Sequence, residues 1–133
     1  MKIKLNQPIL NIEGKNFLRD EQIIDPKNKE KIRMILIKVP LTLKDVIVNS
    51  LLAPRPNEKA ELKLRRSKLA EEIYKENEID LIAEKIVLIK EMIDFYYQTP
   101  FIVYDTYKLL EGEVIRDEIK DIDNIIDVSS LIK

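Results

Sequence analysis

Acidic residues near the C-terminal end are the first candidates for chemistry, because carboxylates can hold a divalent cation. Seven of them lie between positions 111 and 127, and Asp121 and Asp123 form a D-x-D pair. A magnesium site would need a further ligand to converge on this pair. Residues two apart do not share a helix face, so the charged surface of a helix is the simpler interpretation.

Two residue types that most active sites use are missing. The chain has no His and no Cys, which excludes Ser-His-Asp and Cys-His nucleophile pairs, histidine or thiolate metal sites, and disulfides. Its two glycines, Gly14 and Gly112, form no phosphate-binding loop. We therefore expect a non-catalytic protein that needs no cofactor.

A basic stretch, "RPNEKAELKLRRSK", is the second candidate site. A basic helix face could contact phosphates of a nucleic acid irrespective of base sequence. The residues that would form it are Lys59, Lys63, Arg65, Arg66 and Lys68. Glutamates interrupt the stretch and no aromatic residue is interleaved, so a solvated face with ion pairs is the competing interpretation.

Tyrosines form the third candidate site. Tyr104 and Tyr107 lie three apart on one predicted helix, where their rings could form an interaction surface or stack on a base. The alternative is that both rings close the core and leave their hydroxyls at its rim.

Charge is distributed unevenly along the chain of 133 residues, a length typical of one domain. Residues 1–75 hold 17 Lys and Arg against 10 Asp and Glu, whereas residues 76–133 hold 6 against 14. A dipolar molecule can steer one partner or pair with itself, so a homo-oligomer is an open possibility. No apolar run is long enough to cross a membrane and no apolar signal region begins the chain, so we expect a cytoplasmic protein without membrane contact.

The elements that would position these residues begin with strands. "EGKN" at 13–16 predicts a tight turn between apolar segments, and "DPKNKE" at 25–30 predicts a second break. Residues 31–39, "KIRMILIKV", predict a strand covered on one face and partly on the other. The first forty residues therefore predict a small antiparallel sheet.

Helices follow the strands. Thr42 is placed as an N-cap with Asp45 as its capping-box acid, and Pro54 ends that helix. Further helices are predicted over 57–75, from about 80 to 97 and over 100–111; "ENEID" at 76–80 breaks the chain, and Gly112 is the expected C′ residue. The 80–97 helix is apolar on two faces and is predicted to be central.

Residues 113–133 differ from the rest of the chain. Their isoleucines recur at helical spacing on an acidic background, at Ile115, Ile119, Ile122 and Ile126. They predict either a docked terminal helix or an acidic amphipathic arm that binds a partner. The fold class predicted is α+β: a domain over 1–112, with an N-terminal β-hairpin or small three-stranded antiparallel sheet followed by four to five helices.

Three segments carry a resemblance: "LTLKDVIVNSLLAP" (41–54), "IDLIAEKIVLIKEMI" (79–93) and "PFIVYDTYKLLEG" (100–112). Over about residues 1–112 the chain resembles a group of small uncharacterised proteins of tailed phages and prophages. Ile82 and Ala83 stand where that group prefers a Ser or Thr cap, which leaves helix capping to Asp80. The resemblance implies a phage or prophage context and no particular activity.

The function expected from these observations is binding of a host or phage protein, as a regulator or inhibitor. Tyr104, Tyr107 and the isoleucines of 113–133 are the expected interface. A nucleic-acid-binding module on the basic helix 57–75 is the alternative, and a phage tail assembly chaperone is a further one.

Overall fold

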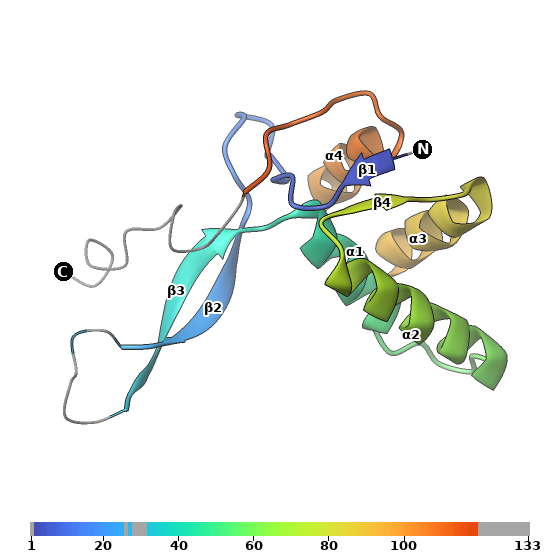
Figure 1. Cartoon of the computed structure of the whole chain (residues 1–133), viewed down its shortest axis with the longest axis horizontal. Helices are drawn as coiled ribbons and strands as arrows, with labels where there is room; N and C mark the ends of the chain where they lie inside the picture. The colour runs from blue at the N-terminus through green and yellow to red at the C-terminus, as the bar shows by residue number, and fades with distance from the viewer. Residues whose placement is uncertain (1, 26, 28–31, 120–133) are drawn as a thin grey trace.

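The computed structural model describes residues 2–25, 27 and 32–119. The element order is β1 (Lys2–Lys4), β2 (Leu18–Ile24), β3 (Met34–Pro40), α1 (Leu43–Leu52), α2 (Ala60–Lys75), β4 (Glu78–Asp80), α3 (Ala83–Tyr96) and α4 (Pro100–Leu110) (Figure 1). The predicted α+β class is confirmed. The described part has two two-stranded antiparallel sheets in place of one three-stranded sheet, and it has four helices.

Helix α1 lies at the centre of the helical layer. It packs against α2, α3 and α4, and four of its apolar side chains are no more than 1% exposed, namely Leu43, Val46, Ile47 and Leu51. The prediction that the 80–97 helix would be central is wrong. Helix α3 buries Ile89, Met92 and Ile93 but leaves Val87 55% exposed, because it packs mainly against α1 and α4.

The predicted entrance to α1 is confirmed. Thr42 is the N-cap: its hydroxyl accepts a hydrogen bond from the Asp45 amide (3.2 Å), and the Asp45 carboxylate accepts one from the Thr42 amide (3.0 Å). Leu41 and Val46, which flank this capping box, are both buried in the main core. These contacts satisfy amides that the first helical turn would otherwise leave unpaired.

The other helix ends agree with the predictions in part. Gly112 has φ +74°, and the amides of Gly112 and Glu113 donate to the carbonyls of Leu109 and Lys108, which is the Schellman arrangement. At the start of α3 the N-cap is Ile82, without a side-chain hydrogen bond. The expectation that Asp80 caps this helix is wrong, because Asp80 belongs to β4.

Strand β4 lies where the sequence predicted a break. Its three residues pair antiparallel with β1, and Ile79 stands opposite Ile3, both of them buried. A three-residue strand has no local periodicity of its own, and its partner lies about 76 positions away in the chain, so this pairing leaves no local sequence signal.

The sheet β2–β3 is a hairpin that projects away from the helices (Figure 1). Its register runs from Leu18 opposite Pro40 to Ile24 opposite Met34. The predicted turn at 13–16 is present, with Gly14 at φ +79°. It is flanked by a single bridge between Leu10 and Asn16, so the long ladder forms between the next two segments of the chain.

A buried ion pair fastens α2 to the end of α1. The Arg66 guanidinium donates to the Glu58 carboxylate (2.6 Å) and to the carbonyl oxygens of Leu51 (3.1 Å) and Ala53 (3.0 Å). The side chains of Arg66 and Glu58 are 6% and 1% exposed. Arg66 thus satisfies carbonyls at the C-terminal end of α1, which otherwise lack intrahelical donors.

None of the helices in the described ranges is long and apolar enough to cross a membrane.

Replacing Arg66 by Leu is expected to lower the free energy of unfolding by about 3–5 kcal/mol, because it leaves the Glu58 carboxylate buried without its partner. Urea unfolding followed by circular dichroism measures the loss. The exposed neighbour provides the control, since Arg65→Leu should change stability by no more than about 0.5 kcal/mol. Equal stability of the two variants would contradict a structural role for this ion pair.

Candidate protein-binding surface

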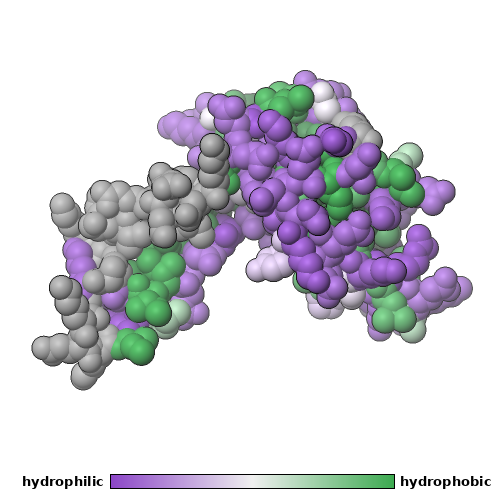
Figure 2. Space-filling model, in the orientation of Figure 1, coloured by the Kyte–Doolittle hydropathy of each residue, from purple (hydrophilic) through white to green (hydrophobic). Residues whose placement is uncertain are grey.

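The outward face of the β2–β3 hairpin carries exposed apolar side chains. Leu18 and Ile24 from β2 are 57% and 59% exposed, and Met34 and Leu36 from β3 are 48% and 69% exposed. Alternation along each strand places all four on one face of the sheet. We call these four residues the hairpin face; hydrophobic side chains reach the surface along this arm in Figure 2.

The opposite face of the same sheet is buried at Ile37 (6% exposed) and Val39 (1%), with Ile23 and Ile35 partly buried against them. These residues form a small core separate from the main one. Strand β3 is therefore apolar on both faces, and only one of the two is buried.

Charged residues lie within and beyond the hairpin face. Asp20 and Lys38, directly opposite each other in the register, form an ion pair in its middle. Towards the tip, among the described residues, Lys27 and Arg33 are exposed and Asp25 is partly buried. The apolar surface is thus bordered at its far end by net positive charge.

The base of the hairpin is held firmly against α1. The Arg19 guanidinium donates to the Asp45 carboxylate (3.0 Å) and pairs with Glu21 on the same strand. Next to it, the amide of Leu41 donates to the carbonyl of Phe17 (2.7 Å). These contacts fix the direction in which the hairpin face points.

The two predicted tyrosines have different surroundings. Tyr107 is partly buried and donates its hydroxyl hydrogen to the Lys90 carbonyl (2.9 Å); burial raises its pKa, as do the nearby carboxylates. Tyr104 is 57% exposed, with its ring 5.4 Å from that of Phe101 and 5.1 Å from the Lys108 ammonium. Tyr107 thus sits at the rim of the core, and Tyr104 presents its ring to solvent.

The helix predicted for the start of 113–133 is absent over 113–119, which is irregular in structure. Ile115 is 75% exposed, whereas Ile119 is partly buried and donates its amide hydrogen to the Asn6 carbonyl (2.8 Å). Ile122 and Ile126 lie outside the described residues, as does the D-x-D pair. Hydrogen bonds to the N-terminal segment replace intrahelical ones over the described part.

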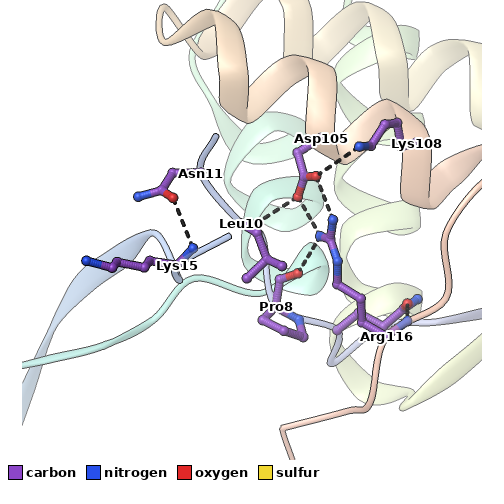
Figure 3. A network of polar contacts seen from close by, with 8 residues as sticks. Pro8, Leu10, Asn11, Lys15, Asp105, Lys108 and Arg116 are labelled. Carbon is purple, nitrogen blue, oxygen red and sulfur yellow. Dashed lines mark hydrogen bonds and ion pairs between the residues drawn. The ribbon is translucent and has the colours of Figure 1, made fainter. Parts of the chain in front are cut away.

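A buried ion pair between Arg116 and Asp105, which we call the clamp, holds this C-terminal stretch in place (Figure 3). The Arg116 guanidinium makes two hydrogen bonds to the Asp105 carboxylate of α4, at 2.6 and 2.7 Å, and a third to the Pro8 carbonyl at 3.0 Å. The same carboxylate accepts the Leu10 amide hydrogen (2.8 Å). The Arg116 amide donates to the Gln7 side chain (2.6 Å), so α4, the N-terminal segment and the C-terminal stretch meet at one point.

Sequence reasoning missed this ion pair, although one signal was present. Asp105 falls on the buried face of α4, between Ile102 and Leu109. A carboxylate at such a position needs a buried partner. The pattern indicates that a cation must approach, but it does not say which one.

The predicted basic face of α2 is smaller than expected. Arg66 is 5% exposed and its guanidinium is paired with the Glu58 carboxylate. The prediction that Arg66 contacts phosphates is therefore wrong. The other four residues, Lys59, Lys63, Arg65 and Lys68, are exposed. Within the described ranges no group of three or more acidic residues is arranged to hold a metal ion.

Asp105→Asn is expected to lower the free energy of unfolding by about 3 kcal/mol, because the partly buried Arg116 loses its counter-charge. Amide hydrogen exchange at Leu10 and Arg116 should accelerate with it. Asp117→Asn, which alters an exposed carboxylate next to the clamp, is the matched control and should leave both quantities unchanged. Unaltered exchange at Leu10 in the Asp105 variant would show that the clamp does not hold the N-terminal segment.

Comparison with protein-family models, with curated proteins and with solved structures gave no match to this chain. The surfaces of the described residues are therefore the basis for its function, and the hairpin face gathers four exposed large apolar side chains on one side of a sheet.

Proposed function

We propose that this is a non-catalytic protein that binds another protein through the hairpin face. The observation that carries the proposal is the exposure of four large apolar side chains on one face of a projecting two-stranded sheet. A lone two-stranded hairpin is only marginally stable in water, and an uncovered apolar face is typical of a surface that a partner buries.

The chemistry of the hairpin indicates the kind of partner. Ile24, Met34 and Leu36 would contact an apolar strip, while Lys27 and Arg33 beyond them favour carboxylates at its border. The partner is thus a protein with an apolar surface bordered by acidic residues. In the phage or prophage context implied by the resemblance, this protein would regulate or inhibit a host or phage process.

The hairpin face is tested by Ile24→Thr combined with Leu36→Thr, which removes apolar surface and places at both positions a β-branched residue that strands favour. Proteins captured from host lysate by the wild type and by this variant are compared by quantitative mass spectrometry. A candidate partner is then purified and its dissociation constant measured. Two truncations in an apolar interface should weaken binding at least tenfold, since central contacts are each worth more than about 1 kcal/mol.

Leu64→Gln is the matched control, because it alters an apolar residue of α2 that is 71% exposed and remote in sequence from the hairpin. It should bind like the wild type. Equal affinity of the hairpin variant, or no protein whose capture depends on Ile24 and Leu36, would overturn the proposal. Light scattering of the purified protein identifies the case in which the partner is a second copy.

Nucleic-acid binding by α2 is the second candidate, favoured by the exposure of Lys63, Arg65 and Lys68 on that helix and of Lys59 at its N-cap. It predicts that the triple change of Lys63, Arg65 and Lys68 to Gln abolishes binding to a labelled duplex. Wild-type affinity should fall steeply with salt, because each phosphate contact releases counterions. Arg66 is left unchanged in this variant, so that loss of binding does not reflect unfolding. An affinity for the duplex that does not change with salt concentration would reject this candidate.

A further inference from the structure

A second open surface lies between α1 and α2, which pack side by side (Figure 1). It is a groove of about 410 Å³, lined by Val48, Leu52, Ser67, Ala70, Glu71 and Tyr74. We call it the α1–α2 groove. It belongs to the helical layer and is separate from the hairpin face.

The groove exists because small side chains alternate with large ones on α2. Ala70 is 2% exposed, and with Ser67 it leaves room above the contact between the helices. Large apolar side chains stand on either side: Leu52 from α1 is 58% exposed and Tyr74 from α2 is 69% exposed. The groove therefore offers apolar walls to an incoming side chain.

The groove continues past the end of α1. A second cavity of about 280 Å³ shares Leu52 and Ser67 with it and reaches Arg55 and Lys63. From Tyr74 to Lys63 the path follows α2 for about 16 Å, at about 1.5 Å per residue. This length matches about three turns of a second helix.

Charge distinguishes the two ends of this path. Arg55 and Lys63 are exposed at the α1 C-terminal end, where the backbone carbonyls are already occupied by Arg66. The Arg55 guanidinium lies over the Phe95 ring, 5.1 Å from its centroid, so Lys63 is the cation without a ring contact at this end. The acidic residue that lines the groove, Glu71, is paired with Lys75 at 3.4 Å. The Arg55–Lys63 end is therefore positive without a matching carboxylate in the groove lining.

We propose that the α1–α2 groove binds an acidic amphipathic helix of a partner protein. Apolar side chains at i, i+3 or i+4, and i+7 of that helix would lie against Leu52 and Tyr74. Its carboxylates would meet Arg55 and Lys63, so charge complementarity sets the preference for an acidic helix. This inference does not depend on the hairpin face, and the protein would then carry two interaction surfaces.

Three synthetic peptides of 14 residues test the groove on the full chain. The first has Leu at helical spacing with Glu elsewhere, the second has Lys in place of Glu, and the third has the composition of the first with the spacing broken. Binding is measured by fluorescence anisotropy. The acidic peptide should bind at least tenfold more tightly than either of the others.

Substitutions locate the binding. Leu52→Glu should weaken binding of the acidic peptide at least tenfold. Lys63→Glu should reduce or reverse the preference of the protein for the Glu peptide over the Lys peptide. Leu64→Gln, on α2 but not in the groove lining, should change neither. Equal binding of the three peptides, no binding, or binding indifferent to Leu52→Glu would each overturn the proposal.

One further variant in this experiment identifies what occupies the groove. If the acidic peptide binds only after Ile122 and Ile126 are changed to Asp, the acidic C-terminal segment of the chain itself competes for the groove. That result would overturn a separate partner as the occupant. The hairpin double variant should bind the peptide normally, so failure at the groove and failure at the hairpin face are distinguishable.

Discussion

One carboxylate oxygen of Asp45 joins the two halves of this fold. It accepts the Thr42 amide hydrogen that closes the helix cap and also the Nε hydrogen of Arg19 at the base of the hairpin, each at 3.0 Å. Since α1 is the helix against which α2, α3 and α4 pack, the same atom sets the direction of the projecting sheet and the start of the central helix. Helix α1 therefore anchors the base of the hairpin and also forms one side of the α1–α2 groove.

Features that depend on neighbours in the chain could be predicted from the sequence. The Thr42 cap, Pro100 in the first turn of α4 and Gly112 at its end each follow from the backbone geometry that these residues favour. Strand β4 could not be predicted, because its formation depends on pairing with β1 at the other end of the domain. The centrality of α1 was missed for a similar reason: how many neighbours surround a helix is decided by tertiary packing.

The candidate surfaces, too, could be predicted only where they depend on local sequence and not on tertiary packing. The dense apolar pattern of 31–39 predicted a strand covered on one face and partly on the other, but only the tertiary structure shows that Leu36 is exposed and Ile37 buried. Arg66 looked like its basic neighbours in the sequence, and its burial became visible only once Glu58 and the end of α1 were placed around it. Charge alone does not distinguish a side chain that anchors a helix from one that is free to bind.

The clamp between Arg116 and Asp105 bears on how the chain folds as it is made. Its hydrogen bonds link residues 109 positions apart, between Gln7 and Arg116, and 95 apart, between Leu10 and Asp105. Contacts so distant in sequence form late and slow the search for the native state. During synthesis the N-terminal segment leaves the ribosome long before Arg116 is added, so the polar groups of Gln7 and Pro8 stay hydrated until Arg116 has emerged as well. The contacts that close the domain are therefore expected to form after the helices α1 to α4, which precede Arg116 in the chain.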